Sequence, residues 1–166
     1  MPYEVIEKDV PEVLVASVTR VAPLATIGKE IGEAFHELME TVEPVGYGPG
    51  MPGTICLEPV DEVLDGRWEI FMPVARSFEP PEGMEVKPLP AAHVASAVHV
   101  GRYDRLGEAY EALELWAREH QREIVGPPRE LYLNDPYEAG EDRAETELQF
   151  PIACRLSRRS RRASAP

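Results

Sequence analysis

The stretch Glu69-Ile70-Phe71-Met72-Pro73-Val74-Ala75 returns 78 residues later as Glu147-Leu148-Gln149-Phe150-Pro151-Ile152-Ala153. Its Glu, Pro and Ala positions are identical, and its apolar positions match in kind. Upstream, Val15-Ala16-Ser17-Val18 returns as Val94-Ala95-Ser96-Ala97-Val98 at an offset of 79. Because the two matches keep their order and an almost constant offset, the sequence predicts one unit of about half the chain, used twice.

Each copy shows the same series of patterns. A Val-rich stretch with period-two alternation predicts a strand, and apolar residues three and four apart then predict an amphipathic helix. Two further β-rich stretches close each copy. The predicted strands are Val13–Val21, Thr54–Leu57 and Trp68–Val74 in copy one, and Ala92–Val100, Arg129–Leu133 and Glu145–Ala153 in copy two. The helical stripes are Ile27, Ile31, Phe35, Leu38 and Val42, then Leu106, Tyr110, Leu113, Trp116 or Ala117, and His120.

These patterns predict an α+β fold. The duplicated strand–helix–strand–strand module forms one curved, mainly antiparallel sheet, with both helices on one face and a groove between them. We expect a single domain over residues 1–156, with module one at about 3–78, module two at about 84–155, and a disordered Arg-rich tail at 157–166. A short strand within the Pro-rich link, Glu85-Val86-Lys87, is expected to mirror Tyr3 to Glu7.

The charge is unevenly distributed. The 166 residues hold 30 acidic and 17 basic side chains, a formal net charge of −13. Five of the basic residues fall in the last 12 positions, so the first 154 residues carry a formal charge of −18. A body of this charge favours cationic ligands and basic partners, and direct DNA binding is not expected. The Arg-rich tail is read as a solvated end, with contact to nucleic acid or to the acidic body as alternatives.

Signals for cofactors and for membranes are missing from the sequence. Cys56 and Cys154 have no Cys-x-x-Cys spacing, and the four histidines have no metal-ligand spacing, so neither a metal nor a cofactor is expected. No apolar run reaches the length of a membrane span, and no signal peptide is found. The sequence therefore predicts a cytoplasmic protein with two reduced thiols.

Glu147 is the first candidate for a functional residue. It lies in a strand with apolar neighbours, where a carboxylate at the floor of the groove would require a cationic or hydroxyl partner. The alternative is that Glu147 points to solvent. Glu69, its counterpart in copy one, has the same ambiguity.

Aromatic side chains of the second half supply the other candidates. Tyr and Trp offer broad apolar faces, a polar tip and attraction for cations, although core packing is the alternative for each of them. The aromatic candidates for ligand binding are Tyr110, Trp116, Tyr132, Tyr137 and Phe150.

Three stretches resemble a known family, the GyrI-like small-molecule-binding domain, also called the AraC-type effector-binding domain. They are Val98-His99-Val100-Gly101-Arg102-Tyr103 leading to Leu106-Gly107-Glu108-Ala109-Tyr110, then Arg129-Glu130-Leu131-Tyr132-Leu133-Asn134-Asp135-Pro136, then Thr146-Glu147-Leu148-Gln149-Phe150-Pro151-Ile152. The resemblance covers the chain from about Tyr3 to Arg155.

The resemblance implies that ligands sit between the two helices, lined by aromatic residues, with a Glu on the last strand. Matching the motifs places that Glu at Glu147 and makes Tyr132 a wall residue of the ligand site. Trp116 and Tyr110 are expected to line the same site because of their positions around the second predicted helix. Many relatives carry a helix-turn-helix DNA-binding domain, but only about ten residues precede the first predicted module strand here. A stand-alone domain is therefore expected.

Three functions remain open. The first is a stand-alone protein that binds apolar, cationic or electrophilic small molecules. The second is a hydrolase of cyclopropane-type genotoxic natural products, with Glu147 as general base and Tyr132 donating to a developing oxyanion. The third is a protein-interaction module that binds gyrase or a regulator. Binding is favoured over catalysis, and oligomeric state is left open.

Overall fold

A computed structural model describes residues 2–58 and 65–154, and it is built on one eight-stranded sheet. The predicted Arg-rich tail and part of the turn after Leu57 lie outside the described residues. No described helix is long and apolar enough to cross a membrane. The strands are β1 (Ile6–Val10), β2 (Val13–Ala22), β3 (Gly53–Cys56), β4 (Gly66–Pro73), β5 (Met84–Leu89), β6 (Ala92–Val100), β7 (Arg129–Tyr132) and β8 (Glu145–Pro151). The helices are α1 (Leu24–Val42), α2 (Gly107–Glu119) and the short α3 (Pro136–Ala139), with 3₁₀ turns η1 (Tyr103–Arg105) and η2 (Glu141–Arg143).

The strand order is the same in each half of the sheet. The full order is β1-β6-β8-β7-β3-β4-β2-β5, and every pairing is antiparallel. Read outward from the central β7–β3 pair, one half is β7-β8-β6-β1 and the other is β3-β4-β2-β5. The predicted fold class is confirmed. The duplication stays a prediction, because a matching strand order does not test whether the two halves arose from one repeated unit.

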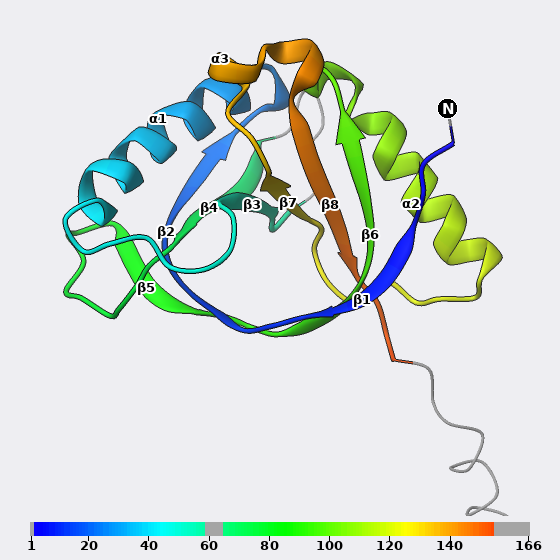
Figure 1. Cartoon of the computed structure of the whole chain (residues 1–166), viewed down its shortest axis with the longest axis horizontal. Coiled ribbons are helices and arrows are strands. Elements are labelled where there is room, and N and C mark those ends of the chain that lie inside the picture. Colours follow the sequence, from blue (N-terminus) through cyan, green and yellow to red (C-terminus); the bar gives the residue numbers. More distant parts are fainter. Residues whose placement is uncertain (1, 59–64, 155–166) are drawn as a thin grey trace, which may run out of the picture.

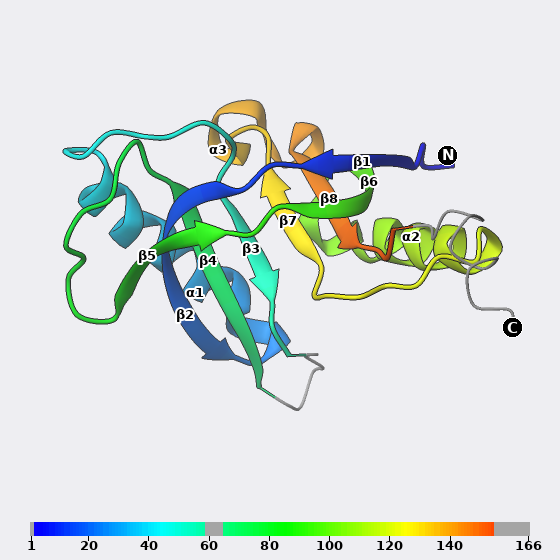
Figure 2. The same ribbon diagram turned by 90° about the horizontal axis from the view of Figure 1, so that it is seen from below.

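The two edge strands are exchanged between the halves. β1 precedes the first half in the chain but pairs with β6 of the second half, and β5 pairs with β2 of the first half. In both pairs residue i lies opposite residue 102 − i, as for Ile6 with Ser96 and Val13 with Leu89. The β1–β2 and β5–β6 segments therefore form one long ribbon, interrupted beside Pro11 and Pro90. The ribbon runs along the bottom of the molecule in Figure 1, the side from which Figure 2 is viewed. Proline lacks the N–H that a ladder needs, which explains the interruption.

Each helix covers one half of the same sheet face. α1 packs its buried residues, including Leu38, on even-numbered side chains of β2 and β4 such as Ile70. α2 packs Leu113 on Ala97 of β6 and Leu148 of β8. In Figure 1 the helices lie on opposite sides of the molecule with β7 and β8 between them. α1 follows the apolar stripe read from the sequence, and α2 follows its stripe through Leu113 and Ala117. The predicted stripe extended to His120, but that residue is exposed beyond the end of α2.

A smaller apolar cluster lies on the opposite face of the sheet. Val15, Ile55 and Phe71 are at its centre and are almost fully buried. Their odd numbers on β2, β3 and β4 place them on the face turned away from the helices, since strand side chains alternate. The sheet therefore has two different buried faces, and a shift of one residue along a strand moves a side chain from one to the other.

Candidate functional site

Three polar side chains at the centre of the sheet point toward the helices. Thr54 on β3 lies opposite Ile70 of β4 and Glu130 of β7, and Glu130 lies opposite Leu148 of β8. Ile70 and Leu148 belong to the cores under α1 and α2, so Thr54 and Glu130 share their face. Tyr132, two residues after Glu130, points the same way.

These side chains and one tyrosine from α2 form a hydrogen-bonded group, which we name the Glu130 cluster: Thr54, Tyr110, Glu130 and Tyr132. The Tyr110 hydroxyl donates to Glu130 Oε1 at 2.5 Å, and the Tyr132 hydroxyl donates to Oε2 at 3.0 Å. Thr54 Oγ1 and the Tyr132 hydroxyl are 3.2 Å apart, and either can be the donor. Each carboxyl oxygen of Glu130 therefore has a phenol as its partner.

Aromatic rings enclose the Glu130 cluster. Phe35 of α1 and Tyr103 of η1 make edge-to-face contacts with Tyr132, at centroid distances of 5.6 and 5.8 Å. Phe150 of β8 lies 5.7 Å from the ring of Tyr110. Glu130 is only 7 % exposed, whereas Tyr103 is 42 % exposed. Elements from both halves of the chain therefore surround one carboxyl group, and Tyr103 is the exposed ring among them.

Burial dominates the electrostatics of the cluster. Desolvation raises the pKa of Glu130, and the hydrogen bonds from Tyr110, Tyr132 and Thr54 oppose this effect without cancelling it. Burial and the nearby Glu130 also raise the pKa of Tyr110 and the pKa of Tyr132. Within residues 2–58 and 65–154, no Lys, Arg or His forms an ion pair with Glu130. The site is thus an apolar enclosure around an acid for which the described part of the chain provides no counter-charge.

The expected position of Glu147 at the floor of the groove is wrong. Glu147 lies opposite Val98 and Leu131, on the sheet face turned away from the helices. Lys8 of β1 forms an ion pair with it at 2.5 Å, and Ser96 donates to the same oxygen at 2.7 Å. The neighbouring Leu148 and Phe150 face α2, and alternation along β8 sends Glu147 the other way.

The surroundings of Glu147 fit a structural carboxylate. Burial on its own raises the pKa of Glu147, but hydrogen bonds from Lys8, Ser96 and Gln149 outweigh burial and the pKa is lowered. Glu69 has a parallel arrangement in the first half, 2.7 Å from Lys87 of β5. Each Lys comes from an edge strand, so these two ion pairs fasten β1 and β5 to the sheet.

The other predicted site residues divide into two groups. Tyr110 and Tyr132 belong to the Glu130 cluster, and Phe150 packs against Tyr110. Trp116 instead stacks on His120 at a centroid distance of 4.5 Å and packs in the core under α2. Tyr137 is 97 % exposed on α3. The structure therefore does not bring Glu147, Tyr132 and Trp116 together.

Glu130 is the functional candidate that sequence reasoning missed. The signal was present in Arg129-Glu130-Leu131-Tyr132, since residues two apart on a strand share a face. Assigning Tyr132 to a ligand wall implied that Glu130 stood beside it. The choice of Glu147 followed the family motif, whose phase relative to the helices the sequence did not fix.

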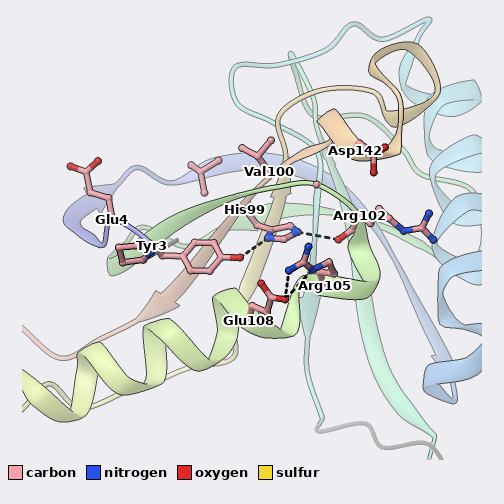
Figure 3. A pocket seen from close by; sticks show the side chains of 11 residues that line it. Tyr3, Glu4, His99, Val100, Arg102, Arg105, Glu108 and Asp142 are labelled. Atoms are coloured by element: carbon pink, nitrogen blue, oxygen red, sulfur yellow. Dashed lines mark hydrogen bonds and ion pairs between the residues drawn. The ribbon is translucent and has the colours of Figure 1, made fainter.

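Two surface pockets lie elsewhere, beside the N-terminal segment, and neither includes Glu130 or Tyr132 in its lining. The first, of about 560 Å³, lies between residues 2–4, the end of β6 and the start of α2 (Figure 3). There the Tyr3 hydroxyl bonds His99 Nδ1 at 2.7 Å, and His99 Nε2 donates to the Arg102 carbonyl at 3.0 Å. The second, of about 510 Å³, runs along α2 and includes Trp116. These two pockets are therefore separate from the Glu130 cluster.

The described residues offer no metal centre. No group of three or more His, Cys, Asp or Glu side chains suited to a metal ion occurs in residues 2–58 and 65–154. Cys56, on β3 with its side chain toward the helices, donates through its thiol to the carbonyl of Glu58. Burial, and then the nearby Glu130, raise the pKa of its thiol, so Cys56 is held as a thiol and not as a thiolate.

The chain belongs to the family of GyrI-like small molecule binding domains, whose model matches residues 3–153. No curated protein matches it. Among solved structures, the C-terminal domain of EcmrR is 23 % identical with a TM-score of 0.82, and the match covers 92 % of this chain and 99 % of that domain. In a complex of EcmrR with DNA, the match covers 90 % of this chain and 57 % of the EcmrR chain, with a TM-score of 0.81 and 23 % identity. This chain thus spans little more than half the length of the EcmrR chain.

Two further structures share the fold at lower identity. A hydrolase from Listeria innocua is 14 % identical with a TM-score of 0.70, covering 92 % of this chain and 93 % of that one. SAV2435 bound to tetraphenylphosphonium is 13 % identical with a TM-score of 0.68, covering 92 % and 94 %. At these identities the likeness establishes the fold alone.

Proposed function

We propose that this protein binds apolar, cationic small molecules at the Glu130 cluster. The observation that carries the proposal is the buried carboxyl of Glu130, which in the described structure is hydrogen-bonded only by hydroxyl groups and is surrounded by aromatic rings. Ring faces attract cations, and apolar surroundings strengthen that attraction because water does not compete. A cation placed there would supply the counter-charge that the described residues do not.

Ligand entry requires a movement on the solvent side of the cluster. Tyr103 and Phe35 pack their edges against Tyr132, and Tyr103 is the more exposed of the two. Rotation of Tyr103 away from Tyr132 would open the space between α1 and α2. The ligand ring system would then replace the Tyr103 ring against Tyr132.

Titration calorimetry with tetraphenylphosphonium tests the proposal, and the probe is chosen because SAV2435 binds it on the same fold. We expect Glu130→Gln to weaken binding by about tenfold or more, since about 1.4 kcal/mol of a desolvated charge interaction is a factor of ten. Glu147→Gln is the matched control, because it makes the same chemical change on the opposite face. Equal affinity in wild type and Glu130→Gln would contradict the proposal.

A second candidate is hydrolysis of electrophilic small molecules such as cyclopropane-containing alkylators. It is favoured by one feature: Glu130 has a raised pKa and contacts two phenols, a set that can move a proton to or from a bound substrate. Incubation with such an alkylator, followed by chromatography for a ring-opened product, tests this candidate. Turnover that persists in Glu130→Gln would exclude Glu130 as the acid or base.

A further inference from the structure

The partners of Glu130 differ in kind from those of the other two buried glutamates in the sheet. Glu147 and Glu69 each have a Lys Nζ within 2.7 Å. Among the described residues, the partners of Glu130 are hydroxyl groups alone, from Tyr110 on α2 and Tyr132 on β7, with Thr54 of β3 also within reach. An ammonium group can only donate a hydrogen bond, whereas a hydroxyl can donate or accept. The Glu130 cluster can therefore hold either form of the carboxyl group.

The hydrogen-bond chain shows how the neutral form is accommodated. Thr54 Oγ1 and the Tyr132 hydroxyl can each be the donor at 3.2 Å. With Glu130 protonated on Oε2, the acid donates to the Tyr132 oxygen, and Tyr132 donates to Thr54. With Glu130 ionised, Tyr132 donates to the carboxylate instead. Both arrangements keep the contacts of Glu130 with Tyr110 and Tyr132, and that of Tyr132 with Thr54, without moving a heavy atom.

The other elements around Glu130 supply no positive charge from residues 2–58 and 65–154. Phe35 of α1 and Tyr103 of η1 pack against the ring of Tyr132. Leu148 of β8 lies directly opposite Glu130 in the sheet. Cys56 of β3 is the remaining titratable group nearby, and burial followed by Glu130 raises the pKa of its thiol. Burial likewise raises the pKa of Glu130. Placing a bare carboxylate in such surroundings is costly, and a proton is the smallest way to remove its charge.

We propose that Glu130 is a neutral acid in the free protein and that a cationic ligand binds in exchange for its proton. In this step the Glu130 O–H bond breaks and the proton passes to the buffer, while the ligand becomes the counter-charge of the carboxylate. Tyr110 and Tyr132 then both donate to that carboxylate. A neutral ligand of similar shape leaves the proton in place. The inference rests on the proposed function and specifies its dependence on pH.

Calorimetry in buffers of different ionisation enthalpy counts the protons released. For tetraphenylphosphonium we expect about one proton released per ligand, and an affinity that rises by up to about tenfold per pH unit while Glu130 is protonated. Triphenylphosphine oxide, an apolar neutral probe, should release none. Glu147→Gln should release as many protons as wild type, and Glu130→Gln should release none. Binding of the cation with no proton release would overturn the inference while leaving the proposed function intact.

Infrared spectroscopy of the free protein tests whether Glu130 is neutral, independently of whether the protein binds cationic ligands. A buried protonated carboxyl has a C=O stretching band distinct from that of a carboxylate. We expect this band at pH 7 in wild type and in Glu147→Gln, and its loss in Glu130→Gln. Absence of the band in wild type refutes the inference whether or not any ligand binds. Its presence, together with failure of tetraphenylphosphonium to bind at any pH, supports the neutral acid and refutes the proposed cationic function.

Discussion

Gly53→Ala is the substitution that most directly tests how the two halves of the sheet meet. Gly53 lies on β3 between Phe71 of β4 and Leu131 of β7. A Cβ added there would lie 2.2 Å from the Glu130 carbonyl oxygen, 2.7 Å from Phe71 Cζ and 2.9 Å from Leu131 Cδ2. The two side chains can rotate away, but the carbonyl oxygen belongs to the β7 backbone.

The size of the effect follows from these contacts. Overpacking of a filled core costs about 1–3 kcal/mol, and each ladder hydrogen bond lost adds about 1 kcal/mol. We therefore expect Gly53→Ala to lower the free energy of unfolding by about 2–5 kcal/mol. Displacement of β7 also moves Glu130 and Tyr132, so ligand affinity should fall as well.

Urea denaturation with a matched glycine measures this prediction. Gly32 lies on the exposed side of α1 with nothing within 4 Å of an added Cβ. Gly32→Ala should stabilise the protein by up to about 1 kcal/mol, because alanine favours a helix more than glycine does. A Gly53→Ala variant as stable as wild type, or two variants that shift stability in the same direction, would refute this account of the β3–β7 contact.

Three further predictions concern other parts of the molecule. Leu113→Ala should lower the free energy of unfolding by about 2–5 kcal/mol in urea, since Leu113 is fully buried under α2; a smaller change would mean that the core collapses around the gap. Hydrogen bonds to Asp9 and then to Glu7 raise the pKa of His93, so its stabilising contribution is complete below about pH 6.5 and is lost as pH rises through the raised pKa. Thermal melts from pH 5.5 to 9 should show this loss in wild type but not in His93→Gln, and parallel curves would contradict it. Tyr137→Ala should leave affinity and stability unchanged, because the ring is 97 % exposed; a loss of tetraphenylphosphonium affinity in calorimetry would restore Tyr137 to the site.

The secondary structure could be read from the chain because its signals are local. The apolar stripe ending at Val42 predicted α1, which ends there, and the period-two pattern predicted β6 with the bounds Ala92–Val100. The short strand expected around Val86 is longer in the structure, Met84–Leu89. Its partner is β2, an assignment that depends on how the two halves wrap around each other. Strand pairing joins distant segments, and no local pattern encodes it.

The choice between Glu130 and Glu147 shows where sequence reasoning stopped. Both residues lie on strands with apolar neighbours, and both are less than 9 % exposed. The sequence established that the aromatic candidates gather in the second half. Only the packing of Leu148 against α2 decided that Glu147 faces Lys8 and that Glu130 faces the space between the helices. Alternation along a strand divides its side chains between two faces but does not tell which face the helices cover. The face that an acid occupies is therefore decided by the packing of a helix on the sheet.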